Sequence, residues 1–146
     1  MRLGSQAESQ AEYLAIHDPV TGLPNRARLE QDLPQYIAAV QAQAAPGHHS
    51  LSLALVNLDR FKGINESFGY AQGDALLGQV AERLRGLCSD LKGLYRYGGD
   101  EFMLVLAGNP VTHALLISQV RALLAPPIRL GLQEHPVSPT ASIGIA

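Results

Sequence analysis

The chain has 146 residues, of which 47% are hydrophobic and 16% charged, and its formal net charge is −2 at pH 7. This length suits one domain with its own core. The low charge excludes the broad basic surface of a duplex-binding protein, so we expect no nucleic-acid partner. No apolar stretch approaches the roughly 20 residues that span a bilayer, so we expect a cytoplasmic domain without direct membrane insertion, whose parent protein can still be membrane-anchored.

The first predicted element is a Gln-, Ala- and Glu-rich stretch over residues 1–16, which we interpret as a linker or the end of a signalling helix. The segment Asp18–Arg26 is dense in turn formers and predicts a loop, in which Asn25 can cap the following helix. Apolar residues at helical spacing extend that helix to Val40, with a kink or a restart expected at Pro34.

A nearly continuous apolar run over Leu51–Leu58 predicts a central strand buried on both faces. A second helix is predicted over Gly73–Cys88. Short strands at Leu94–Tyr97 and Glu101–Ala107 are separated by two glycines, which predicts a hairpin because paired glycines supply positive φ without a Cβ penalty.

The remaining predicted elements are a helix over Val111–Leu124, ended by Pro126, and two strands over Ile128–Leu132 and Thr140–Ala146. The predicted order is therefore α-β-α-β-β-α-β-β. We interpret it as an α+β, ferredoxin-like sandwich, in which helices flank one mainly antiparallel sheet.

Three polar clusters interrupt the apolar pattern. Asn57 and Asp59 end the buried strand and share one face by its two-residue period. Asp74 opens the next helix, where the helix dipole alone would favour a carboxylate. The hairpin Gly98–Glu101 combines glycines that allow a ligand to approach closely with two adjacent carboxylates that repel unless a cation is present. The alternative for this hairpin is a solvated tip.

If the first strand pairs beside the hairpin, these clusters converge. The convergence would gather hard oxygen ligands near Lys62, which suits magnesium together with a polyphosphate. The ligands are Asn57, Asp59, Asp100 and Glu101. We therefore predict a metal-assisted phosphoryl or nucleotidyl transfer site.

Four segments in this order resemble the GGDEF family: Asp18–Arg26, Asn57–Asp74, the signature Arg96–Phe102, and Ala141–Ala146. On this resemblance we expect a GGDEF domain over residues 17–146, with the palm fold of nucleotidyl cyclases. It implies a bacterial diguanylate cyclase of cyclic di-GMP signalling. Active members pair as transient homodimers, bind one GTP per domain and two Mg²⁺ ions, and release pyrophosphate.

The resemblance also implies roles for single residues. Asn65 and Asp74 match the guanine readers, since a carboxylate accepts hydrogen bonds from N1–H and the exocyclic amine, whereas an amide donates to O6 or N7. Lys62 and the backbone of Phe61 match phosphate contacts. The backbone of the two hairpin glycines, Gly98 and Gly99, would lie under the phosphates.

The implied metal ligands are the Asp100 side chain and the Leu58 carbonyl, and Glu101 matches an acidic residue that binds metal or deprotonates the hydroxyl. At Asn57 the family usually has a metal-binding Asp, so an amide replaces a carboxylate and brings no charge. Asp59 lies on the same face of the predicted strand. This substitution weighs against catalysis, because magnesium sites depend on one or two carboxylates plus phosphates.

Two hypotheses therefore stay open beside a purely structural dimerisation domain. One is an active diguanylate cyclase. The other is a catalytically weak GTP-binding regulatory domain that controls an attached EAL phosphodiesterase domain or another output. The family continues beyond the last matched strand with a further helix, so we expect a longer protein, with a fused EAL or sensor domain as a candidate partner.

The feedback site of the family is an Arg and an Asp three residues apart, and the corresponding positions here are Ser89 and Lys92. One charge is lost and the other is reversed, so we predict that cyclic di-GMP does not bind there. Titration with the dinucleotide, followed by NMR or crystallography, checks this. Density or shifts that place it at these two residues would refute the prediction.

Overall fold

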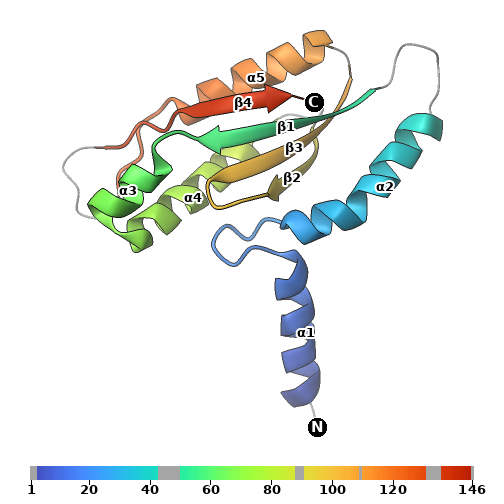
Figure 1. The fold of residues 1–146 in the computed structure, drawn as a ribbon, viewed down its shortest axis with the longest axis horizontal. Helices are drawn as coiled ribbons and strands as arrows, with labels where there is room; N and C mark the ends of the chain where they lie inside the picture. The colour runs from blue at the N-terminus through green and yellow to red at the C-terminus, as the bar shows by residue number, and fades with distance from the viewer. Residues whose placement is uncertain (1–2, 43–49, 88–90, 109, 131–135, 146) are drawn as a thin grey trace.

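The computed structural model describes residues 3–42, 50–87, 91–108, 110–130 and 136–145. Its four strands form one antiparallel sheet in the order β2-β3-β1-β4, flanked by helices (Figure 1). The helices are α1 (Leu3–Ile16), α2 (Arg26–Ala42), α3 (Phe61–Phe68), α4 (Tyr70–Arg85) and α5 (Pro110–Leu124). The strands are β1 (Ser50–Leu58), β2 (Leu91–Arg96), β3 (Glu101–Gly108) and β4 (Ala141–Ile145). The predicted α+β class is confirmed.

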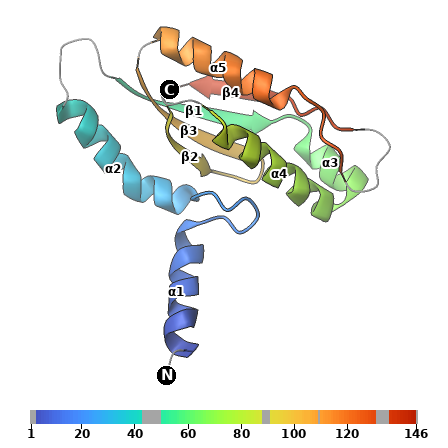
Figure 2. The same ribbon diagram turned by 180° about the vertical axis from the view of Figure 1, so that it is seen from behind.

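The main core lies between the sheet and helices α4 and α5, which cover the face seen in Figure 2. Alternate β1 residues Ala54, Val56 and Leu58 point into this core and are at most 3% exposed. Leu76 and Leu84 of α4 are buried against them, because the 3.6-residue period keeps both on one helix face.

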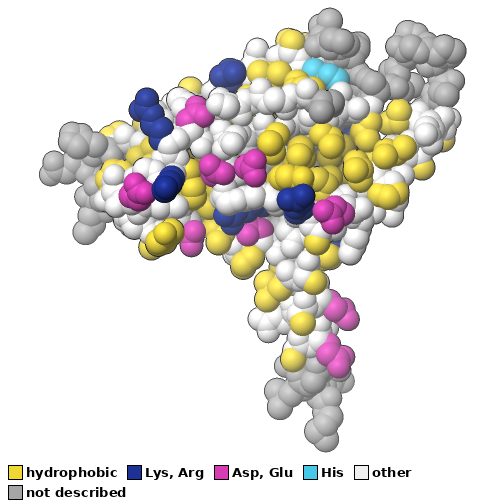
Figure 3. Space-filling view, viewed as in Figure 1, with side chains coloured by type: hydrophobic (Ala, Val, Ile, Leu, Met, Phe, Trp, Pro, Cys, Tyr) yellow, Lys and Arg dark blue, Asp and Glu magenta, His cyan; other side chains and the backbone are white. Residues whose placement is uncertain are grey.

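The opposite face of the sheet carries a smaller core. Leu29 of α2 packs there with Tyr95 and Val105, and the odd-numbered leucines of β1, Leu51 to Leu55, are only partly buried at its margin. Figure 3 shows hydrophobic side chains gathered on this side. The expectation that β1 is buried on both faces is therefore wrong, since a helix layer covers one face and α2 covers only part of the other.

Helix α3 was not predicted. Its apolar residues Phe61, Ile64 and Phe68 recur at helical spacing, but eight residues are too few for that pattern to stand out. The helix follows Arg60, which has a left-handed backbone (φ 61°) and turns the chain out of β1. Gly69, with φ 89°, then separates α3 from α4 in a conformation that glycine adopts without a Cβ penalty.

Two further expectations need correction. Residues 128–130 of the predicted strand Ile128–Leu132 form no strand, and Ile128 makes only an isolated antiparallel bridge to Val137. Residues 131–132 lie outside the described part of the chain. At Pro34 the predicted restart is absent, because α2 runs through this exposed residue, and the alternative of a kink stays a prediction.

Among the residues described, none of the helices combines the length and the apolar character that crossing a bilayer requires.

A polar network attaches α2 to the edge strand β2. The Tyr95 hydroxyl donates to Asp32 Oδ2 at 2.7 Å and lies 2.6 Å from the Tyr36 hydroxyl. Arg28 Nε donates to Asp32 Oδ1 at 2.9 Å and completes the network. Burial, followed by the hydrogen bonds to Tyr36 and Asp32, raises the pKa of Tyr95 far above its ordinary value.

Because the folded state holds Tyr95 neutral, its folded pKa exceeds its unfolded pKa. The stabilisation is therefore complete below the ordinary tyrosine pKa of about 10 and is lost as the pH rises above it. We expect Tyr95→Phe to lower the free energy of unfolding by about 1 kcal/mol at pH 7 and to reduce the alkaline loss of stability. Thermal melts between about pH 7 and pH 11 measure both effects.

The matched control is Tyr70→Phe, because the Tyr70 side chain is 78% exposed. It should change neither the melting temperature nor its pH dependence. An alkaline slope in Tyr95→Phe equal to that of the wild type would contradict the assignment.

Candidate functional site

The candidate site lies at the end of the sheet where β1 finishes and the β2–β3 hairpin turns (Figure 1). In the β1–β3 ladder Asn57 is directly opposite Glu101, and the Leu58 N–H donates to the Asp100 carbonyl at 2.9 Å. Side chains directly opposite in an antiparallel pair lie on the same face. The structure thus brings Asn57 and Glu101 together, as expected if the first strand pairs beside the hairpin.

Asp59 joins this group but is engaged by β4 and the residue before it. Ser142, opposite Asn57 in the β1–β4 ladder, donates its hydroxyl to Asp59 Oδ1 at 2.8 Å. The Thr140 hydroxyl donates to Asp59 Oδ2 at 3.0 Å. Both carboxylate oxygens therefore hold β4 against the end of β1, which gives Asp59 a structural role that sequence reasoning did not find.

The hairpin glycines act differently from the expectation. The hairpin was predicted because paired glycines can supply positive φ. Within the described residues, the glycines with positive φ are Gly22 and Gly69, so neither Gly98 nor Gly99 adopts it and that reason was wrong. A Cβ at Gly98 would instead collide with the Glu101 carboxylate. A Cβ at Gly99 would meet no atom within 4 Å, so this backbone is open to a ligand.

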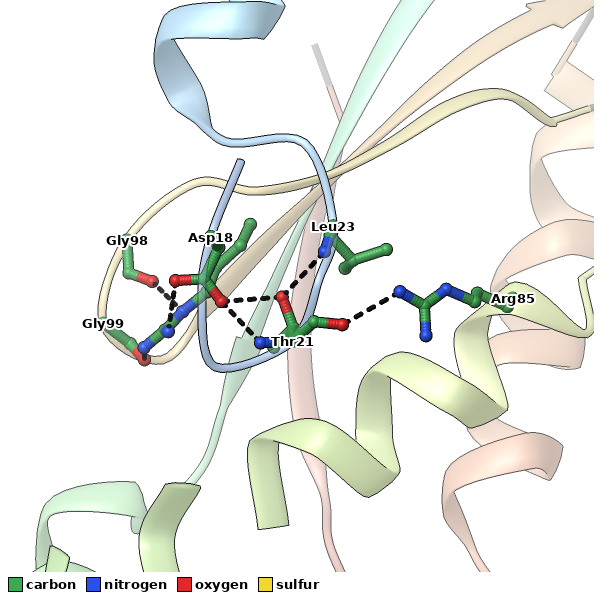
Figure 4. A network of polar contacts seen from close by, with 7 residues as sticks. Asp18, Thr21, Leu23, Arg85, Gly98 and Gly99 are labelled. Carbon is green, nitrogen blue, oxygen red and sulfur yellow. Dashed lines mark hydrogen bonds and ion pairs between the residues drawn. The ribbon is translucent and has the colours of Figure 1, made fainter. Parts of the chain in front are cut away.

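The hairpin turn is held by one arginine (Figure 4). Arg96 donates from Nε to the Gly98 carbonyl at 3.2 Å and from Nη2 to the Gly99 carbonyl at 2.8 Å. Its Nη1 pairs with Asp18 Oδ1 at 2.8 Å, and the two side chains are only 15% and 13% exposed. The planar guanidinium suits this task because its donors point in several fixed directions at once.

Asp18 is itself fixed by the loop that precedes α2. Its Oδ2 accepts hydrogen bonds from the Thr21 N–H at 2.8 Å and the Thr21 hydroxyl at 2.7 Å. Arg85 of α4 donates to the Thr21 carbonyl at 2.9 Å, so the loop is also attached to the helix layer (Figure 4). Neither Asp18 nor Arg96 was assigned an individual role from the sequence. One signal in the sequence could have indicated the role of Asp18. An Asp at the start of a turn can accept a hydrogen bond from a backbone N–H within that turn.

The proposed guanine readers lie on the helices that follow β1. Asn65 is half-buried on α3, and Asp74 is exposed in the first turns of α4. Lys62, also on α3, is exposed and lies 3.9 Å from Glu66 Oε1. Two residues separate the end of β1 from the start of α3, so α3 and the start of α4 lie at the same end of the sheet as the hairpin turn (Figures 1 and 2).

Two cavities border the site. One of about 360 Å³ lies between the loop before α2 and the hairpin, and its lining includes Arg26, Arg96, Gly98 and Gly99. Another of about 320 Å³ lies at the end of β1, and its lining includes Leu58, Asp59, Ile64 and Thr140. Asn65 and Asp74 line neither of these two cavities.

The donor set can be tested against magnesium. In the part of the chain that the structure describes, no three His, Cys, Asp or Glu side chains gather to hold a metal. The available donors are the Asp100 and Glu101 carboxylates, the Asn57 amide and the Leu58 carbonyl. These hard oxygens fit Mg²⁺, which binds one or two carboxylates and completes its shell with phosphates and water.

The two positions of the feedback-site prediction remain untested. Ser89 lies outside the described residues, and Lys92 is exposed on β2.

Known proteins resemble this chain in sequence and in fold. MucR of Pseudomonas aeruginosa, named a bifunctional diguanylate cyclase/cyclic di-GMP phosphodiesterase, is 36% identical over 143 residues, which are 97% of this chain and 20% of that protein. A sensory box/GGDEF family protein from Caulobacter crescentus superposes with a TM-score of 0.76 at 32% identity, over 90% of this chain and 82% of that one. The coiled coil and GGDEF domain of DgcB from the same species, in complex with c-di-GMP, gives a TM-score of 0.80 at 26% identity, over 99% and 74%.

These likenesses define a nucleotidyl-cyclase palm, as expected. Residues 15–146 match the family described as "Diguanylate cyclase, GGDEF domain", and the chain belongs to this family of cyclic di-GMP signalling domains. It spans about a fifth of the length of MucR and of two further curated relatives.

The Arg96–Asp18 pair makes a testable contribution to stability. Asp18→Asn leaves the Arg96 charge largely buried without its counter-ion, so we expect the free energy of unfolding to fall by about 2 kcal/mol. Urea denaturation measures the loss.

Glu30→Gln is the control for this experiment, because it removes an exposed ion pair with Arg26 at 3.5 Å. Exposed pairs contribute at most about 1 kcal/mol, so its effect should be small. Equal losses in the two variants would contradict the special role of Asp18.

Proposed function

We propose that this GGDEF domain binds GTP at the junction of β1, α3 and the β2–β3 hairpin and acts as a diguanylate cyclase. The proposal rests on the register that sets Asn57 opposite Glu101 and on the hydrogen bond from Leu58 to Asp100. That register joins the family signature to the strand end that leads into Lys62 and Asn65.

Guanine is recognised by the two side chains after β1. The Asp74 carboxylate accepts from the N1–H and the exocyclic amine, and the Asn65 amide donates to O6 or N7. Adenine carries an acceptor at N1, so Asp74 would face a lone pair and ATP is rejected. Both residues lie at the surface of the domain, where the base can reach them from solvent.

The triphosphate follows the backbone towards the hairpin. The Lys62 ammonium and the Phe61 backbone contact phosphate oxygens, and the open backbone at Gly98 and Gly99 lies under the chain of phosphates. Nothing within 4 Å of the Cβ position of Gly99 blocks this approach. Arg96 binds the carbonyls of Gly98 and Gly99 on one side of the turn, so the other side is available to the ligand.

Two Mg²⁺ ions, when bound, would neutralise the phosphates and lower the pKa of the attacking hydroxyl. Asp100, the Leu58 carbonyl and the Asn57 amide would hold them. Glu101 lies opposite Asn57 and accepts the proton of the hydroxyl, or assists in binding the metal.

The reaction needs two copies of the domain. The 3′-oxygen of each GTP forms a bond to the α-phosphorus of the other, and the bond to the β-phosphate oxygen breaks. Two GTP therefore give one cyclic di-GMP and two pyrophosphates. Each domain supplies one nucleotide, so the working unit is a transient homodimer in the cytoplasm, where GTP is available.

The domain itself is proposed to span residues 17–146, and residues 1–16 are the end of a signalling helix or a linker. In support, α1 (Leu3–Ile16) projects away from the sheet and its side chains over residues 7–15 are exposed (Figure 1).

The set of side chains available to bind magnesium favours a second function. Asn57 is neutral, and the carboxylate two residues further along, Asp59, has both oxygens engaged by Thr140 and Ser142. A domain with this donor set could bind GTP without turnover and regulate an attached phosphodiesterase domain, of the EAL type, or another output. The relative MucR, a bifunctional diguanylate cyclase/cyclic di-GMP phosphodiesterase, supports such an arrangement.

One substitution separates the two functions. We expect Asn57→Asp to raise the rate of cyclic di-GMP formation about tenfold, because a further carboxylate restores charge at the metal site. This factor corresponds to about 1.4 kcal/mol of activation free energy. The wild type and the variant are incubated with GTP and Mg²⁺, and the product is quantified by chromatography.

Asp74→Asn serves as the control and should abolish GTP binding in either background. GTP binding without turnover in both the wild type and Asn57→Asp would favour the regulatory function. Failure of the wild type to bind GTP, with Asp74 intact, would overturn both proposals.

A further inference from the structure

Helix α3 packs against α4 at Gly73. The Gly69 N–H donates to the Asn65 carbonyl at 2.9 Å and closes α3, and the Gly73 N–H donates to the Gly69 carbonyl at 3.1 Å in the first turn of α4. The position that a Cβ of Gly73 would take is already filled by the Asn65 amide. Such a Cβ would overlap Asn65 Oδ1 and lie 3.0 Å from Asn65 Cγ.

The Asn65 amide has two different ends in this environment. Its Oδ1 is buried and has no hydrogen-bond partner within the described structure. A buried acceptor without a partner is unfavourable. Because Oδ1 has no partner within the described structure, no hydrogen bond accounts for its position. The space left by the missing Cβ of Gly73 accounts for it instead.

We propose that Gly73 is a positioning residue for guanine recognition: its missing side chain seats Asn65 Oδ1 and directs Nδ2 towards the base. This inference rests on the proposed function, since it takes Asn65 to be a guanine reader. It assigns part of the selectivity for GTP to a residue that touches no ligand.

Helix stability alone does not account for this glycine. Glycine inside a helix is less stable than alanine, and Gly73 lies within α4. Gly78, five residues further along the same helix, offers a comparison. A Cβ there would meet only the Val20 carbonyl, at 3.9 Å, which is ordinary contact.

The test compares Gly73→Ala with Gly78→Ala. In Gly73→Ala the added methyl group meets the end of a flexible side chain, so Asn65 must turn away while the fold persists. We expect an unchanged or higher melting temperature, about tenfold weaker GTP binding and a smaller preference for GTP over ATP. Gly78→Ala should keep the GTP affinity of the wild type.

A double-mutant cycle with Asn65→Ala shows whether Gly73 acts through Asn65. If it does, Gly73→Ala combined with Asn65→Ala binds GTP no more weakly than Asn65→Ala alone. Additive losses would overturn the proposal, and so would wild-type affinity or unfolding of Gly73→Ala.

A measurement without nucleotide keeps this test separate from the proposed function. The Asn65 side-chain NH₂ signals in a ¹⁵N NMR spectrum should shift in Gly73→Ala and not in Gly78→Ala. If they shift but the wild type binds no GTP, the proposed function fails and the role of Gly73 in recognition fails with it. If the wild type binds GTP and the signals do not move, only the present inference is overturned.

Discussion

The candidate site depends first on the guanidinium of Arg96. It ties the hairpin turn, through the carbonyls of Gly98 and Gly99, to the carboxylate of Asp18 in the loop before α2. Because three donors of one rigid plane are used, the turn cannot move without breaking several charge-assisted hydrogen bonds. The helix α1 ends only two residues before Asp18, so the entry of the chain into the domain is connected directly to the signature turn.

The second constraint is the register of the sheet. Ala54, Val56 and Leu58 must face α4 and α5, and this sets Asn57 on the opposite face beside Glu101. A slip of one residue would exchange the two faces and separate the polar pair. The buried side chains of β1 therefore decide where the chemistry-bearing residues lie.

Much of this fold could be predicted because hydrophobic periodicity reports burial. The pattern was sufficient for β1, β3 and α5, whose buried residues repeat over many positions. It missed α3, which is short, and it predicted a strand where the described residues 128–130 form none. Ile128 and Leu130 are indeed buried on alternate positions, but alternation reports which side chains are buried and does not report which strand they pair with.

The linear order of residues by itself determined the family and the kinds of side chain in the site, since both are carried by short local motifs. Only the tertiary structure decided how they are used. Arg96 meets Asp18 across 78 positions, and Asp59 meets Thr140 and Ser142 across 81 and 83. Such contacts depend on distances in space that packing of the sheet and helices creates, and no local pattern contains them.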